Sequence, residues 1–165
     1  MPVYVEIAGR AYPLRFTLRG ALRLLDLTGQ TPMELLAPGL RNTALLLYAA
    51  LCDGCPHVTL SQAAALCASA ARERDALSRL LSALALALAE SGLDQTRLDR
   101  DILRRLLRAA RRAGYPQPLA LLDATYCELC EALEAFLGRR GAAPGAPMTD
   151  RQMQGVMRAL AERSK

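Results

Sequence analysis

The chain has 165 residues, enough for one ordinary domain or for one domain with a small addition. A chain of this length can bury a core without disulfide or metal cross-links. Leucine (33) and alanine (30) dominate the composition, tryptophan is absent, and the formal net charge is +5, with arginine supplying 20 of the 21 basic residues. This composition favours helices and excludes an all-β sandwich or barrel, and the mean hydropathy of +0.12 with 22% charged residues excludes a wholly disordered chain.

The first seventeen residues predict a β-hairpin. Apolar residues alternate with other residues in 3–7, a second short run covers 12–16, and a glycine-containing turn at 8–11 separates the two. Pro13 cannot donate a backbone hydrogen bond, so we expect its strand at an edge. Because a lone hairpin is only marginally stable in water, this one must pack on helices or join the sheet of a partner.

From Leu18 onward the pattern is helical, and the first helix is expected to run to Thr28 and to stop at Gly29. Four later helix starts carry a threonine followed three residues on by Glu or Gln, the signature of a capping box. These pairs are Thr31/Glu34, Thr59/Gln62, Thr125/Glu128 and Thr149/Gln152. The remaining helices are predicted at about 40–52, 60–70, 72–90, 99–113, 118–122, 126–139 and 150–163. The fold class is therefore α+β and mostly α-helical, with an N-terminal β-hairpin packed on a small helical bundle.

The chain divides into three parts by composition. Residues 1–91 form a hairpin plus helical domain, 92–138 a helical extension, and 139–165 a Gly/Pro/Ala-rich linker with a C-terminal helix. The linker composition is typical of flexible segments, so we expect it to detach the last helix from the body of the protein.

Two Cys-x-x-Cys pairs are the candidate metal ligands. Cys52 with Cys55 and Cys127 with Cys130 offer the four thiolates of a tetrahedral zinc site. The second pair lies inside a predicted helix, where small thiols are more often core residues than ligands. Zinc is therefore only a minor alternative, and we expect no cofactor.

Residue types that carry catalysis are scarce. His57 is the only histidine, and it lies in a predicted loop. The chain has no Walker A loop, no GxSxG and no HExxH motif, so we expect a protein that is not an enzyme.

The longest apolar stretch, Leu80–Ala89, is far shorter than the roughly 20 residues that span a bilayer, so we expect no membrane partner. The first residues lack the basic and apolar regions of a signal peptide. We therefore expect a cytoplasmic protein whose five cysteines remain free thiols.

Seven arginines fall within residues 97–112. On a helix, four of them form one basic stripe, which consists of Arg100, Arg104, Arg108 and Arg111. The opposite face is apolar. Such a stripe can follow phosphates or dock an acidic protein, or it can simply be solvated. No aromatic residues are interleaved with it, and the arginine bias of the whole chain fits coding composition, so nucleic acid is kept as an alternative partner only.

The helix expected to end at Glu90 is apolar on nearly all faces, whereas a one-sided surface helix needs only a stripe. We therefore expect it to serve partly as core and partly as an interface between copies of the chain in a homo-oligomer, with a role in the core alone as the alternative. The predicted self-association and partner surface consists of Tyr12, Leu14, Phe16, Leu77, Leu81, Leu84 and Leu88.

The N-terminal half resembles the tail assembly chaperones of long-tailed (siphovirus-type) phages. The resemblance rests on residues 7–29, with the Tyr12–Phe16 strand and the Thr28-Gly29 helix end, on the Leu45–Leu51 helix, and on the Pro56–Gln62 segment, and it covers about residues 3–90. The second part is similar to the extension that these chaperones gain by translational frameshifting, through residues 113–116 and 125–129.

The resemblance implies a non-enzymatic function. Members of this family self-associate and coat the tape measure protein, and their extension recruits tail tube subunits. The sequence thus predicts a phage or prophage tail assembly chaperone. The alternatives are a small arginine-rich nucleic-acid-binding regulator and a tail or head–tail component that is retained in the particle.

Overall fold

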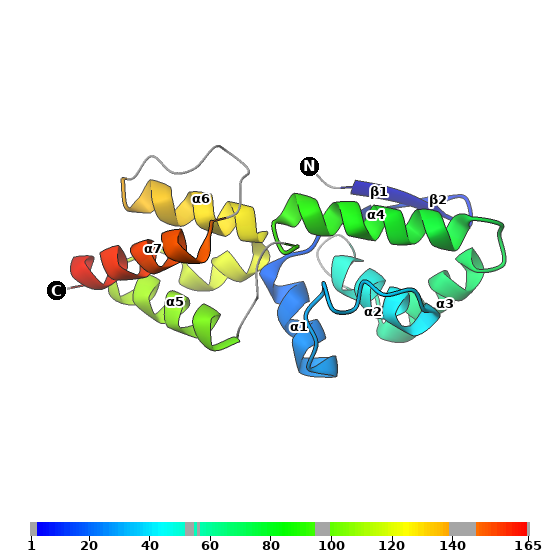
Figure 1. Ribbon diagram of the computed structural model, residues 1–165, viewed down its shortest axis with the longest axis horizontal. Helices are drawn as coiled ribbons and strands as arrows, with labels where there is room; N and C mark the ends of the chain where they lie inside the picture. The colour runs from blue at the N-terminus through cyan, green and yellow to red at the C-terminus, as the bar shows by residue number, and fades with distance from the viewer. Residues whose placement is uncertain (1–2, 52–54, 56, 95–99, 139–147, 165) are drawn as a thin grey trace.

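The computed structural model describes residues 3–51, 55, 57–94, 100–138 and 148–164. These residues form two lobes that lie end to end, an N-lobe of residues 3–94 and a C-lobe of residues 100–164 (Figure 1). The elements of the N-lobe are β1 (Val3–Ile7), β2 (Arg10–Leu14), α1 (Leu18–Thr28), α2 (Leu40–Leu51), α3 (Leu60–Ala70) and α4 (Ala76–Ser91). Those of the C-lobe are α5 (Arg100–Arg112), the 3₁₀-helix η1 (Pro118–Asp123), α6 (Tyr126–Phe136) and α7 (Asp150–Arg163). The predicted fold class, α+β and mostly helical with an N-terminal hairpin, is confirmed.

Strands β1 and β2 pair antiparallel and are joined by a two-residue turn. Both turn residues have positive φ, 51° at Ala8 and 74° at Gly9, as the twist of a tight hairpin requires. Pro13 lies opposite Tyr4 in a sheet that has two strands among the described residues. The hairpin was expected either to pack on helices or to join the sheet of a partner. The structure shows that it packs on helices, because both strands contact helix α4.

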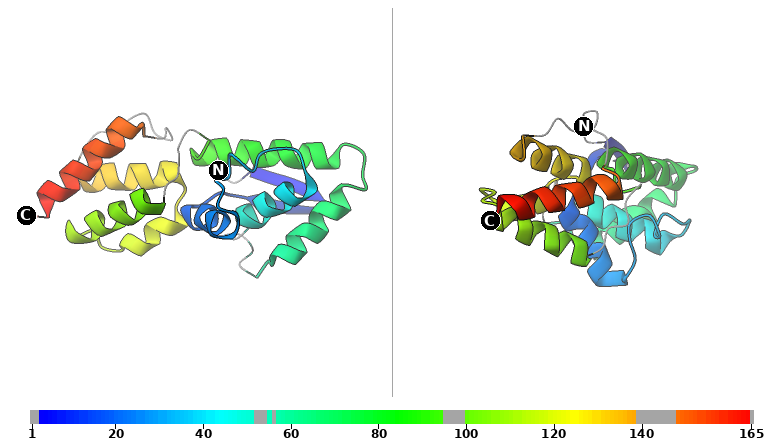
Figure 2. Two further views of the ribbon diagram at one scale, coloured as in Figure 1. Left: turned by 60° about the horizontal axis from the view of Figure 1, so that its bottom comes forward. Right: turned by 60° about the vertical axis from the view of Figure 1, so that its left-hand side comes forward.

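Helix α2 lies at the centre of the N-lobe. It contacts α1, α3, α4 and β2, and the side chains of Leu46, Leu47 and Leu51 are fully buried. Helix α4 runs alongside the hairpin, as Figures 1 and 2 both show. Since α4 is covered both by the hairpin and by helices α2 and α3, it needs apolar residues on more than one face.

All four predicted capping boxes form their reciprocal hydrogen bonds. The threonine hydroxyl accepts from the amide three residues on, and the Glu or Gln side chain accepts from the threonine amide. Three of them begin helices α3, α6 and α7. The prediction of a helix after Thr31 is wrong, because the chain forms only turns and bends there. The following Pro38 lacks an amide hydrogen and disfavours a helical residue before it.

Two other predicted helices are shorter than expected. Residues 71–75 form turns, with Asp75 at a positive φ of 61°, so α4 begins only at Ala76. Helix α6 ends at Phe136, followed by a turn to Gly138.

Helix α7 belongs to the C-lobe, contrary to the prediction that the last helix is detached. It packs against α5 and buries Met153, Val156 and Leu160. The guanidinium of Arg163 donates to the carbonyl of Phe136 (2.6 Å) and lies 4.3 Å over the ring of that residue. These contacts hold α7 in place. The predicted linker, 139–147, lies outside the described residues.

Within the described part of the chain, no helix is both long enough and apolar enough to cross a membrane.

Candidate partner-binding surface

The structure separates the predicted self-association residues into two groups. Leu14, Phe16, Leu84 and Leu88 are fully buried inside the N-lobe, because α4 and the end of β2 face the lobe's own core. Tyr12, Leu77 and Leu81 are half-buried. The first four side chains are therefore core residues and are unavailable to a partner in this conformation.

Other large apolar side chains are exposed instead. The sequence pattern did not single these out, because an isolated exposed leucine resembles a core leucine until its neighbours are known. In the N-lobe they are Tyr4, Leu27, Met33, Leu40, Leu60 and Leu86, and in the C-lobe Ile102 and Leu119. Leu119, with 69% of its surface exposed, is the most exposed of them.

Helix α5 carries the predicted basic stripe, and the structure places all four arginines at exposed positions. Its opposite face buries Leu103, Leu106 and Ala110, as the helical period predicts. Ile102, an apolar residue of the same helix, is 44% exposed. Arg100, at the start of the stripe, forms an ion pair with Asp26 of α1.

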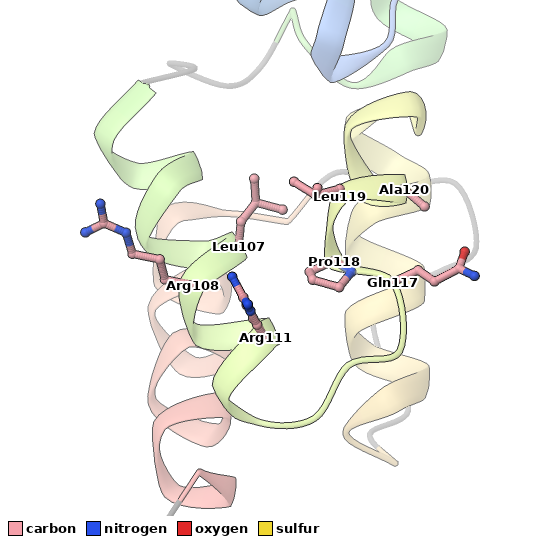
Figure 3. A pocket seen from close by; sticks show the side chains of 7 residues that line it. All are labelled: Leu107, Arg108, Arg111, Gln117, Pro118, Leu119 and Ala120. Carbon is pink, nitrogen blue, oxygen red and sulfur yellow. The ribbon is translucent and has the colours of Figure 1, made fainter.

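A groove of about 610 Å³ lies beside this stripe, between α5 and η1 (Figure 3). The side chains of Leu107 and Leu119 point toward each other across it from the two elements. The full lining consists of Leu107, Arg108, Arg111, Gln117, Pro118, Leu119 and Ala120. The groove is therefore mostly apolar, it is open to solvent at Leu119, and it has guanidinium groups along its α5 side.

Leu107 is half-buried in the structure, and for 118–122 the sequence pattern predicted a short helix without a functional role. A usable sequence signal is the pair Pro116 and Pro118, which restricts the backbone directly before Leu119, the exposed leucine of η1.

The four cysteines that the structure describes are not brought together into a metal site. Among the described residues, no three His, Cys, Asp or Glu side chains are placed to hold a metal ion. Cys67 and Cys130 are buried, and burial raises the pKa of each thiol from 9.0 to about 11. Such thiols stay protonated at neutral pH and are poor ligands and nucleophiles. Cys52 lies outside the described residues.

Cys127 lines a second cavity, of about 540 Å³, where the end of β2, the C-terminal turns of α4 and the start of α6 meet. Burial raises the pKa of this thiol, and nearby carboxylates, with Glu131 the strongest, raise it further.

Ion pairs and a backbone hydrogen bond cross the junction where the two lobes meet. Arg15 forms an ion pair with Glu128 (2.6 Å) and Arg19 one with Asp123 (2.5 Å), and both pairs join the lobes, as the Arg100–Asp26 pair also does. The amide of Leu18 donates to the carbonyl of Ala124 (3.0 Å). Each ion pair is partly exposed.

No protein-family model, curated protein or solved structure matches this chain significantly.

Proposed function

We propose that this chain is a tail assembly chaperone of a long-tailed phage or prophage. It acts without catalysis in the cytoplasm of the host cell, self-associates, binds the tape measure protein and keeps it soluble, and helps to recruit tail tube subunits. The observation that carries the proposal is the division of the chain into two lobes, the second of which has an apolar groove that is open to solvent.

The lobes follow the two parts of the resemblance. Residues 3–90, which are similar to the chaperone part of the family, make up nearly all of the N-lobe. Residues 113–116 and 125–129, which are similar to the extension, lie in the C-lobe. A protein that holds one partner while it recruits another needs two such binding units on one chain.

The exposed apolar side chains also support this function. A tape measure protein is a long, largely helical chain that aggregates alone, so its chaperone must cover apolar helix surface. The N-lobe exposes Leu27, Leu40 and Leu86 on three different helices. Exposed leucines on rigid helices can pack against amphipathic helices of varied sequence.

Co-expression tests the proposal. The chain is produced together with a fragment of the tape measure protein from the same genome, and the soluble fraction of that fragment is compared with its fraction when it is expressed alone. We expect a several-fold increase, co-purification of the two chains, and an oligomer by size-exclusion chromatography with light scattering. An unrelated aggregation-prone helical protein serves as the control client.

A fragment that stays insoluble and a chain that elutes as a monomer would together overturn the proposal. Equal rescue of the control client would show unspecific binding and would contradict it as well.

The exposed arginines of α5 favour a second candidate, a nucleic-acid-binding regulator. This candidate predicts binding to duplex DNA that weakens steeply with salt, because each phosphate contact releases counterions. Titration of labelled DNA with nuclease-treated protein at several salt concentrations distinguishes the two functions.

A further inference from the structure

We propose that the groove between α5 and η1 binds an acidic amphipathic helix of a partner protein. The inference rests on the proposed function only where it takes the partner to be a protein that the chain helps to assemble. The kind of segment that fits follows from the residues that line the groove.

The floor of the groove favours an apolar helix face. Leu107 and Leu119 face each other across it, and Pro118 and Ala120 extend the apolar lining along η1 (Figure 3). Leu119 exposes 69% of its surface, so its burial by a partner would remove apolar area from water. A helix that offers leucines three and four residues apart can place successive side chains along such a groove.

The rim of the groove favours negative charge. On α5, Arg104 and Arg111 lie three residues before and four residues after Leu107, so both share its side of the helix. Arg104, Arg108 and Arg111 have no hydrogen-bond or ion-pair partner among the described residues. These guanidinium groups are thus available to carboxylates that flank the apolar face of a bound helix.

The charge excess of the whole chain is concentrated in α5. The chain has 21 basic and 16 acidic residues, and α5 alone has six arginines and one aspartate. The rest of the chain therefore holds 15 residues of each sign and has no net charge. This one helix is the part of the protein that attracts an acidic partner over distance.

The composition of the groove favours a helix over nucleic acid. Phosphates need the arginines but gain nothing from an apolar floor, and no aromatic side chain lines the groove to stack on a base. A second copy of the chain is also a poor occupant. Its most acidic helix, α6, buries its own apolar face through Leu129, Cys130 and Leu133.

Fluorescence anisotropy with a synthetic probe tests the inference on the full-length protein. The probe is a labelled peptide of about 15 residues, with leucine at helical i, i+3, i+4 and i+7 spacing and glutamate at the other positions. We expect saturable binding that weakens when salt screens the ion pairs. A peptide with lysine in place of every glutamate is the charge control and should not bind.

Two pairs of variants locate the site. Arg111→Glu should weaken binding about tenfold or more, whereas Arg112→Glu changes the next residue of the same exposed helix end, outside the groove, and should have a small effect. Leu119→Ser should likewise reduce binding about tenfold, whereas Leu27→Ser removes a similarly exposed leucine from the N-lobe and should leave it unchanged. Circular dichroism checks that each variant is folded.

Each other outcome overturns the inference. These outcomes are no saturable binding, equal binding of the lysine peptide, equal effects of the control variants, displacement of the probe by duplex DNA at lower concentration, and loss of probe binding as the chain self-associates. If the peptide fails to bind while the tape measure fragment is still kept soluble, only this inference falls. If the peptide binds and the fragment stays insoluble, only the proposed function falls.

Discussion

At Gly20, helices α1 and α2 pack so closely that a side chain would not fit without a shift of the backbone. A Cβ atom built on this buried residue would stand 2.7 Å from the carbonyl oxygen of Ala49, a backbone atom that cannot rotate away. The amide of Gly20 also donates to the hydroxyl of Thr17, which caps α1 (3.2 Å). Glycine is thus required here for close packing of two helices, and its φ is not in the left-handed region.

The variant Gly20→Ala tests this contact. Alanine in a helix interior should stabilise the protein by up to about 1 kcal/mol, but the steric overlap with Ala49 should cost about 1–3 kcal/mol. We expect a net loss of stability in urea denaturation followed by circular dichroism. Ser82→Ala, at an exposed position of α4, is the control and should change the free energy of unfolding by no more than about 0.5 kcal/mol. A stabilised Gly20→Ala protein would show that α1 and α2 are not this close.

At the scale of elements, short sequence motifs predicted the features that depend on hydrogen bonds between residues close together in the chain. The boxes at Thr59, Thr125 and Thr149 mark helix starts because the hydrogen bonds involved span only three residues. The box at Thr31 forms the same bonds, yet Pro38 and Gly39 follow too soon for a helix to grow. A capping box thus predicts where a helix begins, and the residues that follow decide whether there is one.

Packing between distant elements could not be predicted in the same way. The apolar residues of α4 indicate burial, but only the arrangement of the hairpin and α2 around it shows that Leu84 and Leu88 face inward while Leu86 faces solvent. The groove depends in turn on where η1 lies against α5, a contact between segments that no short motif encodes. The basic stripe was predictable because it follows from the helical period alone.

Helix α7 illustrates the same limit, and its packing is testable. Leu160 is fully buried where α7 meets the C-lobe, so Leu160→Ala should destabilise that lobe by about 2–5 kcal/mol. Arg158→Ala, at an exposed position of the same helix, is the matched control and should have little effect. Hydrogen exchange read by mass spectrometry should show faster exchange throughout α5 and α7 in Leu160→Ala only. Equal exchange in the two variants would mean that α7 is detached, as its preceding linker composition suggested.

At the scale of the whole molecule, one apolar cluster includes residues of both lobes, and ion pairs add to it where the lobes meet. In addition to this apolar cluster, the junction has partly exposed ion pairs and the Leu18–Ala124 hydrogen bond. Exposed ion pairs contribute only about 0–1 kcal/mol each and weaken with salt. The ion pairs therefore stabilise the junction only weakly, and we expect salt or acid to loosen it.

The carboxylates of the junction give it a defined pH dependence. The hydrogen bond from Arg19 holds the pKa of Asp123 below its ordinary value of 3.8. Burial pushes the pKa of Glu128 upward, but the amide of Thr125 and the Arg15 guanidinium outweigh it and lower the pKa below 4.5. Both groups bind fewer protons in the closed junction than when free. Their contribution is thus complete above these ordinary values and is lost as the pH falls through the lowered ones.

We therefore expect acid to loosen the junction before either lobe unfolds. Small-angle X-ray scattering should show a larger radius of gyration as the pH falls below about 4, and high salt at neutral pH should act in the same direction. The double variant Arg15→Met with Arg19→Met should have a loosened junction already at pH 7, with faster exchange of the Leu18 amide and a nearly unchanged melting temperature. Arg41→Met, which replaces an exposed arginine of α2 that takes part in none of the junction pairs, should behave as the unmodified chain. If the Leu18 amide exchanges equally slowly in the double variant and in Arg41→Met, the ion pairs do not hold the junction, and the apolar contacts between α1 and η1 alone must do so.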